Sequence, residues 1–328
     1  MDALPFENRK QQILVKKDSI TDEKLGCIPE KRSADTIIDY GIVNLNKPKG
    51  PTSHMVSGYV QKILGLSKAG HSGTLDPGVT GVLPVALGRA TRIVQTMLNA
   101  GKEYVCIMHI HKPVAEDEAR KIINTFVGKI TQLPPVRSAV VRQMRERTIY
   151  YLEILEIKGQ DILFRVGCQA GTYIRKLCHD IGYKLKVGAH MAELIRTKAG
   201  PFMFDEMTTL QDLEDALWYW KNKQNDKFLK HCIKPVEAGV EHLPKIWVHD
   251  SAVDSICHGA SLNAPGVSKL TDDILAESDI AIMSLKNELV ALAKAKKNSN
   301  EIIKLEKGTV AITSKVFMQP NTYQKIQS

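Results

Sequence analysis

The sequence predicts an α+β protein, with a mixed or antiparallel sheet and flanking helices, followed by a small β-rich region. Three observations support this class. Apolar segments of strand length follow one another without a regular strand–helix–strand repeat, and helical segments are inserted singly between them. Beyond about residue 245 the pattern changes to short strands separated by glycine and charged turns. We therefore expect two folded regions of different character.

The chain begins with a polar, charged stretch, residues 1–37, which predicts an extension with little core of its own. Residues 42–47 then predict a short apolar strand that ends in a turn rich in proline and glycine. Thr52 or Ser53 can cap the helix that follows. Its apolar residues have helical spacing: Val56, Tyr59, Val60, Ile63 and Leu64.

The middle of the chain alternates strands and helices. Residues 104–110 alternate as a strand should, and strands are also predicted at 148–157 and 161–167 around a turn at Gly159. Acidic residues 116–118 open a helix with an apolar stripe at Ile122, Ile123 and Phe126. A further helix within 172–185 is marked by Ile174, Leu177, Cys178 and Ile181.

The last third of the chain predicts a separate domain. Charged residues 221–227 end a helical region, and short strands follow at 279–284, 288–295 and 308–318. We place the boundaries so that residues 1–37 are an N-terminal extension, 38–245 the main domain, and 246–328 a compact β domain with a tail.

The composition of the chain indicates which class of partner it binds and in which compartment it is found. The 328 residues include 45 Lys and Arg against 36 Asp and Glu, and the net charge of +9 favours a polyanionic partner. The six cysteines are scattered without a C-x-x-C pair, which predicts neither a zinc site nor a disulfide framework. The N-terminus lacks a signal-peptide core and no apolar run has membrane-spanning length, so we expect an intracellular protein away from membranes.

Residues 70–84 are the most informative segment. Four glycines and two prolines hold Asp76 on a short irregular loop, GHSGTLDPGVTGVLP. An isolated D-P-G is usually only a turn. A catalytic group must however be held rigidly, because a loosely positioned carboxylate loses effective molarity. The length of the pattern favours a catalytic role for Asp76.

This segment resembles the active-site motif of the TruB-type pseudouridine synthases, most of all their dyskerin branch in archaea and eukaryotes. The resemblance covers nearly the whole chain from about residue 38. It implies that Asp76 is the essential catalytic residue and that His71 lies beside the target nucleotide. GKEYVC, residues 101–106, resembles the motif whose tyrosine stacks on the target base, which implies this role for Tyr104.

Further motifs of the family follow in order. GTYIRKL, residues 171–177, resembles the segment whose arginine pairs with the catalytic carboxylate, which implies Arg175, with Tyr173 lying against the base. Lys47 in NKPKG and Leu194 in AELIRTKAGPF match further pocket positions.

Each of these residues has a plainer interpretation when it is taken alone. Tyr104 and Leu194 would be ordinary core, Arg175 a surface charge, and Lys47 a solvated side chain. Tyr173 and Arg175 are two residues apart and can share a face only in extended backbone, so we expect both in the lead-in to the helix.

Three positions depart from the dyskerin pattern. Gly78 and Val141 stand where lysine is usual, and Ile195 stands where arginine is usual. Each change removes a positive charge near the expected path of the RNA, so phosphate contacts there would be weaker.

Two other patterns have alternatives. His109 and His111 on one strand face could be a metal pair, but no third ligand is evident and a surface face is favoured. Basic residues 142–147 are either a solvated face or an RNA contact. The chain has no nucleotide-binding glycine motif, in keeping with an isomerase that needs no cofactor and no metal.

The function implied by the resemblance is isomerisation of uridine to pseudouridine in RNA. Residues from about 246 resemble a PUA domain, a small RNA-binding module, near which the N-terminal extension is expected to pack. Asp76 could act either as a nucleophile or as a base. The base would have to be turned out of the RNA before reaction, with Tyr104 and Tyr173 holding it.

The dyskerin-like features imply the catalytic subunit of an H/ACA ribonucleoprotein. The expected partners are the guide RNA, substrate ribosomal and transfer RNA, Nop-type and Gar-type small proteins, and a kink-turn-binding ribosomal-like protein. No lysine-rich tail follows the PUA-like region, which favours an archaeal, cytoplasmic protein over a eukaryotic, nucleolar one. The alternatives are a stand-alone synthase acting on the TΨC loop of transfer RNA, and a non-catalytic RNA-binding scaffold of the particle.

Overall fold

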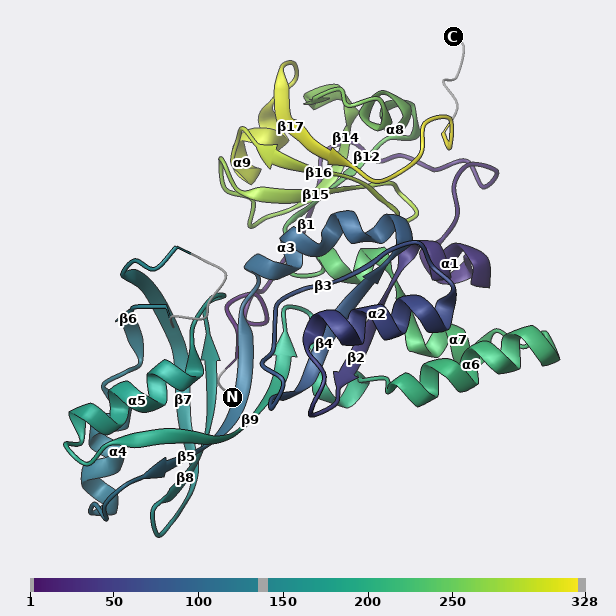
Figure 1. Cartoon of the computed structure of the whole chain (residues 1–328). Coiled ribbons are helices and arrows are strands. Elements are labelled where there is room, and N and C mark those ends of the chain that lie inside the picture. The colour runs from purple at the N-terminus through teal and green to yellow at the C-terminus, as the bar shows by residue number, and fades with distance from the viewer. Residues whose placement is uncertain (1–2, 135–140, 324–328) are drawn as a thin grey trace. The chain divides into compact units, whose positions relative to one another are not determined.

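A computed structural model describes residues 3–134 and 141–323 of the chain, and divides it into two compact units (Figure 1). Unit 1 contains residues 1–8, 43–87 and 93–232, and unit 2 contains residues 9–42, 88–92 and 233–328. The sequence predicts boundaries near residues 38 and 245, and the structure divides the chain before residues 43 and 233. The α+β class is confirmed, because each unit combines a sheet with helices.

Unit 1 is built on a mixed sheet. Strand β4 runs parallel to β9, whereas the pairs from β9 onward, β9–β5, β5–β8, β8–β7 and β7–β6, are antiparallel. Two short strands lie off this path: β3 (Ala69–His71) pairs with β4, and β10 (Phe202–Met203) pairs with β9. The order across the sheet is β2 (Gly41–Lys47), β4 (Thr80–Leu87), β9 (Ala189–Ala199), β5 (Lys102–Ile110), β8 (Asp161–Cys168), β7 (Arg145–Lys158) and β6 (Gly128–Gln132).

The helices of unit 1 pack on this sheet through the apolar faces that their spacing predicts. Helices α4 and α5 lie on the strands β5, β8 and β7 (Figure 1), where their buried residues join one core with Phe164 and Cys106. Thr52 caps α2, since its hydroxyl accepts the Met55 N–H at 3.2 Å. The bounds are α2 (Ser53–Leu64), α3 (Val94–Asn99), α4 (Glu116–Asn124), α5 (Ile174–Lys184), α6 (Leu210–Lys223) and α7 (Lys227–Cys232), with a 3-10 turn at Phe204–Glu206.

Unit 2 holds a second, smaller domain whose strands enclose an apolar core of Ile, Val, Leu and Ala. Strands β12 and β15 pair in parallel and the other pairs are antiparallel. The order is β1 (Ile13–Val15), β14 (Val267–Thr271), β12 (Lys245–Val248), β15 (Asp279–Met283), β16 (Leu289–Ala295), β17 (Thr309–Val316) and β13 (Leu262–Asn263). The other elements of the unit are α1 (Ala34–Tyr40), β11 (Ile233–Pro235), α8 (Asp250–Cys257), α9 (Ser299–Lys304), and 3-10 turns at Pro29–Lys31, Val236–Val240 and Ala264–Gly266. The 3-10 turn Gly88–Ile93 lies in unit 2 except for its last residue, Ile93, which belongs to unit 1.

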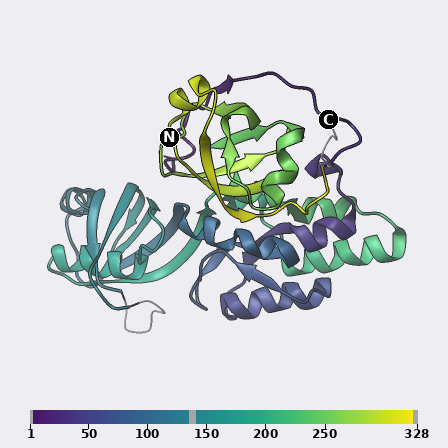
Figure 2. The same ribbon diagram turned by 90° about the horizontal axis from the view of Figure 1, so that it is seen from above.

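Residues 9–37 of the N-terminal extension are an integral part of unit 2, whereas residues 1–8 belong to unit 1. Strand β1 forms one edge of its sheet by pairing with β14, and the purple segment in Figure 2 follows the outside of this unit. The Lys16 ammonium donates to the carbonyl oxygens of Ile302, Ile303 and Leu305 at 2.9, 3.0 and 2.6 Å. Residues 9–42 therefore belong to unit 2 through hydrogen bonds to the β domain, although their sequence predicts little core of their own.

Across the described ranges, 3–134 and 141–323, no helix has both the length and the apolar character needed to cross a lipid bilayer.

Candidate active site

Asp76 lies on the loop between β3 and β4, and this loop is fastened at several points. The hydroxyl of Ser53, at the start of α2, accepts the Leu75 N–H at 2.8 Å and lies 3.1 Å from the Leu75 carbonyl oxygen, to which it donates. The Val79 N–H donates to the Asp76 carbonyl at 3.0 Å. The side chains of Leu75 and Val79 are buried on either side of Asp76, so its carboxylate is held outward on a fixed backbone.

Lys47 lies beneath this loop. Its ammonium donates to the carbonyl oxygens of Pro48, Pro77 and Val79 at 2.9, 3.3 and 2.9 Å, and the residue is fully buried. Burial lowers the pKa of Lys47, and the charge of Asp76 opposes that shift. These contacts flank Asp76, so the geometry fits a residue that positions the loop rather than one that reaches the RNA.

Arg175 is brought to Asp76 by the fold. Although the two residues are far apart in the sequence, a guanidinium nitrogen of Arg175 forms an ion pair with the Asp76 carboxylate. Both side chains remain more than half exposed, at 59% and 53%. An exposed pair adds little stability. Its consequence is that the carboxylate is oriented while it stays accessible to a large substrate.

Tyr173 immediately precedes helix α5, and its backbone is clamped by Gln132. The Tyr173 N–H donates to the Gln132 side-chain oxygen at 3.0 Å, and the Gln132 amide donates back to the Tyr173 carbonyl at 3.2 Å. Tyr173 has extended backbone, as predicted, but the expectation for Arg175 was wrong, since it lies inside the first turn of α5. The helix can begin earlier than expected because Gln132, which is buried, satisfies the backbone groups of its cap.

Tyr104 and His71 lie on neighbouring elements of the same unit. Tyr104 is half-buried on β5, and burial raises its pKa, with the charge of Asp76 adding to this rise. His71 ends β3, and burial, with the charges of Arg196 and His54, lowers its pKa, so its imidazole is neutral at pH 7. Its buried Nδ1 has no hydrogen-bond partner among the residues that the structure describes.

Leu194 is buried, whereas the three residues that depart from the family pattern are exposed. Leu194 packs in the core of unit 1, opposite Cys106 on β5. Gly78, Val141 and Ile195 are all exposed. The missing positive charges therefore concern the surface of the protein, and one of them, at Gly78, lies on the Asp76 loop itself.

Two residues that contact the site are absent from the sequence prediction. Gln132 ends strand β6 with no motif around it, so no sequence signal marks it. Arg196 is almost fully buried on β9. The sequence does carry a signal for Arg196. It is a charged residue at a strand position whose side chain faces the interior, and charged residues are rarely buried there without a role.

The His109 and His111 pair gains a neighbour in the structure. His190 on β9 lies with its Nδ1 3.0 Å from the Nε2 of His111, and His109 pairs with Asp161 at 2.7 Å. In the described part of the chain, however, no group of three such side chains is placed to hold a metal ion.

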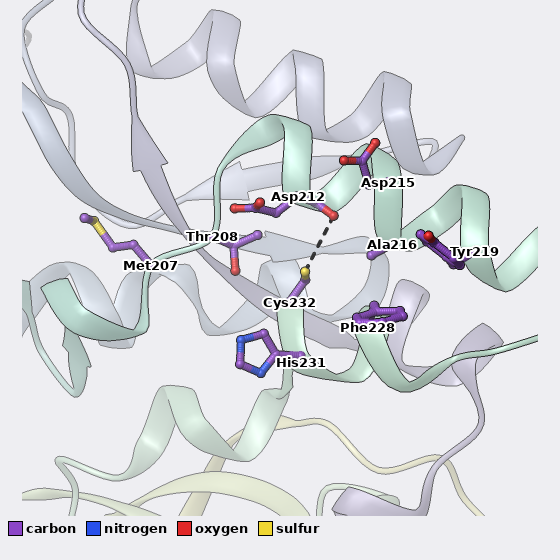
Figure 3. Close-up of a pocket in the computed structure, with 9 residues that line it drawn as sticks. All are labelled: Met207, Thr208, Asp212, Asp215, Ala216, Tyr219, Phe228, His231 and Cys232. Atoms are coloured by element: carbon purple, nitrogen blue, oxygen red, sulfur yellow. Dashed lines mark hydrogen bonds between the residues drawn. The ribbon is translucent and has the colours of Figure 1, made fainter.

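A pocket elsewhere in unit 1 contains none of the predicted site residues. It has a volume of about 330 Å³ and lies between α6 and α7, with the Cys232 thiol donating to the Asp212 carbonyl at 3.8 Å (Figure 3). Its lining residues are Met207, Thr208, Asp212, Asp215, Ala216, Tyr219, Phe228, His231 and Cys232. Asp76 and Arg175 are not among them, and their side chains are more than half exposed.

Four protein-family models match the chain, and together they cover most of it. The TruB family pseudouridylate synthase N-terminal domain matches residues 61–119 and 109–174, and the tRNA pseudouridylate synthase B C-terminal domain matches residues 175–241. The PUA domain matches residues 244–317, and the DKCLD (NUC011) domain matches residues 2–57.

Relatives of similar length exist in archaea. The probable tRNA pseudouridine synthase B of Methanopyrus kandleri is 52% identical over 98% of this chain and 95% of its own. The protein of the same description from Pyrococcus abyssi is 53% identical over 97% of this chain and 96% of its own.

Solved structures match over the full length of the chain. A chain from the crystal structure of a Cbf5-Nop10-Gar1 complex has a TM-score of 0.95 and 50% identity, with 99% of both chains covered. A chain from the structure of an H/ACA RNP bound to a substrate RNA containing 2'-deoxyuridine has a TM-score of 0.93 and 48% identity, covering 99% of this chain and 100% of that one.

Proposed function

Because the chain belongs to the TruB family of pseudouridylate synthases, we propose that it isomerises uridine to pseudouridine in RNA, with Asp76 as the catalytic carboxylate. The observation that carries this proposal is the ion pair between Asp76 and Arg175. It presents an oriented, accessible carboxylate on a loop that Lys47 and Ser53 hold from beneath. A scaffold that only bound RNA would have no use for this arrangement.

The reaction breaks the bond between N1 of uracil and C1' of the ribose and forms a bond between C5 and C1'. The proton lost from C5 is balanced by one gained at N1, so there is no net oxidation and no cofactor is required. Asp76 starts the reaction either as a nucleophile or as a base. The neutral imidazole of His71 lies at the end of β3, which leads into the Asp76 loop.

The uridine must leave the RNA stack before Asp76 can reach its glycosidic bond. Tyr104 and Tyr173 provide aromatic surface for the detached base, and stacking of this kind is worth roughly 1–3 kcal/mol per base. Gln132 fixes the backbone of Tyr173, and the pairing of β5 with β8 fixes the backbone of Tyr104, so neither backbone segment needs to be ordered during binding.

We further propose that a guide RNA selects the uridine. The solved relatives are described as an H/ACA RNP with substrate RNA and as a complex with Nop10 and Gar1. The PUA domain and the N-terminal segment of unit 2 would bind the guide, and the small proteins, with a kink-turn-binding protein, would complete the particle. The archaeal relatives named as tRNA pseudouridine synthase B favour an additional action on transfer RNA.

The test is to map pseudouridine in ribosomal and transfer RNA by primer extension or mass spectrometry. Wild type and Asp76→Asn are compared, each with and without guide RNA and the small proteins. We expect wild type to form product. Asp76→Asn should lower the rate by more than about 1,000-fold, as removal of an essential catalytic group does.

The arms separate the candidate activities. Product that requires the guide supports the guided enzyme, and product in transfer RNA without a guide supports the stand-alone activity. RNA binding without product under every condition would contradict the proposed catalysis and leave the scaffold as the function.

A further inference from the structure

Arg196 occupies the centre of the sheet of unit 1, where it adjoins both the strand that follows the Asp76 loop and the strand that carries Tyr104. It lies on β9 and is only 1% exposed. On one side its register partner is Gly81 on β4, and on the other side it is Tyr104 on β5. One residue is therefore in contact with two of the parts from which the site is built.

The guanidinium of Arg196 holds the Asp76 loop at both ends. Its Nε donates to the Val82 carbonyl at 2.7 Å, and one terminal nitrogen donates to the Gly73 carbonyl at 3.2 Å. Gly73 precedes Asp76 and Val82 follows it. Because the two bonds come from one planar group, they fix the distance and the angle between the ends of the loop.

Arg196 also lies directly opposite Tyr104 in the pairing of β9 with β5. The positive charge of Arg196 opposes the rise that burial causes in the pKa of Tyr104. Cross-strand partners project on the same face of a sheet, so the contact follows from the register of β5 and β9. Arg196 is thus placed beside the Tyr104 side chain by the pairing of the two strands.

No carboxylate within the described ranges forms an ion pair with Arg196. Buried charges are normally paired, because the loss of hydration is otherwise uncompensated. Here the carbonyl oxygens of Gly73 and Val82 take the place of the acid, and burial lowers the pKa of Arg196. An apolar residue would fill this position at lower cost, so stability alone does not account for the arginine.

We propose that Arg196 is a positioning residue that holds the Asp76 loop and the Tyr104 ring in a fixed relation to each other. It does not touch the RNA or the reacting atoms. The inference rests on the proposed synthase activity, since it assigns a role in that same site. Displacement of a reacting group by about 1 Å can reduce a rate on the order of 100-fold.

The first test replaces Arg196 with lysine, which keeps a positive charge but cannot make the planar, forked contacts. Single-turnover rates of pseudouridine formation are measured with saturating enzyme, together with the Kd for the RNA and the free energy of unfolding. We expect Arg196→Lys to react on the order of 100-fold more slowly, with an unchanged Kd, at a temperature where circular dichroism shows it folded.

Arg165→Lys is the matched control. Arg165 lies on β8 of the same sheet and pairs with Glu153 toward the surface, so we expect its rate to equal that of wild type. A folded Arg196→Lys enzyme with the wild-type rate would refute the proposal. A loss that appears only in the Kd would also refute it, because Arg196 would then serve RNA binding.

A double-mutant cycle with Tyr104→Phe gives a second measurement. If Arg196 acts partly through the Tyr104 hydroxyl, the rate losses of the two substitutions should be less than additive, whereas independent effects would simply add. Additive losses would contradict the proposed action of Arg196 on Tyr104. An inactive wild type would instead contradict the proposed function itself, so the two failures are distinguishable.

Discussion

Two buried lysines, Lys47 and Lys102, perform similar work at the scale of single residues. Each ammonium donates to three backbone carbonyl oxygens, which matches the number of its donors. Lys47 holds the Asp76 loop, and Lys102 holds the end of α3, two residues before Tyr104. Both therefore fasten chain segments next to the proposed site by bonds that the surrounding protein shields from water.

Lys102 predicts a dependence of stability on pH. Burial, with the charge of Arg196, lowers its pKa to about 7 in the folded protein, from an ordinary value of 10.5. Between these values the unfolded chain binds a proton that the folded protein does not, so the free energy of unfolding should rise with pH. The contribution approaches about 1.4 kcal/mol per pH unit. Urea unfolding between pH 7 and pH 8.5 measures it.

Lys102→Met is the reference for this measurement, because other groups also titrate in the range. The variant should be less stable overall, since three carbonyl oxygens lose their donor. The difference in stability between wild type and Lys102→Met should grow as the pH rises. A difference that stays constant across the range would show that Lys102 keeps its ordinary pKa.

At the scale of elements, the close approach of β4 and β9 depends on Gly81. A Cβ atom at this position would lie 2.2 Å from the Arg196 carbonyl oxygen, and the φ angle of Gly81 is +102°. Gly81→Ala must therefore move backbone as well as adopt a strained conformation. We expect it to lower the free energy of unfolding by about 2–4 kcal/mol, as measured in urea.

Gly58→Ala provides the comparison for this substitution. Gly58 lies in the interior of α2, with no atom within 4 Å of the position that its Cβ would take. Alanine favours a helix over glycine by about 0.5–1 kcal/mol, so this change should stabilise the protein slightly. If both substitutions had the same effect, the spacing of β4 and β9 would not be what Gly81 provides.

Elements were easier to predict from the sequence than the contacts between them. The helix at α2, the strands β5, β7 and β8, and the buried stripe of α5 are confirmed, because their apolar periodicity is local. The start of α5 was misplaced, because its cap is supplied by Gln132 from a distant strand. The burial of Lys47 and the role of Arg196 likewise depend on partners that only the folded chain brings near.

At the scale of the whole molecule, Glu288 joins three distant parts of the sequence within unit 2. It is 4% exposed, and its carboxylate accepts the Cys27 N–H at 2.9 Å, the Ser284 hydroxyl at 2.8 Å and the Tyr323 hydroxyl at 2.5 Å. Burial, and then the bond to Glu288, raises the pKa of Tyr323. The N-terminal extension and the C-terminal segment are thus tied to the β domain by one acidic group.

Glu288→Ala should therefore loosen both ends of the chain. Three donors would lose a charged acceptor, so we expect the free energy of unfolding of this unit to fall by about 3 kcal/mol or more. Limited proteolysis should cut within residues 9–37 faster than in wild type, because their anchoring at Cys27 is lost. Glu306→Ala, which removes an exposed acid from the same unit, should change neither measurement. Unaltered protease resistance in Glu288→Ala would show that β1 and Lys16 alone hold the extension.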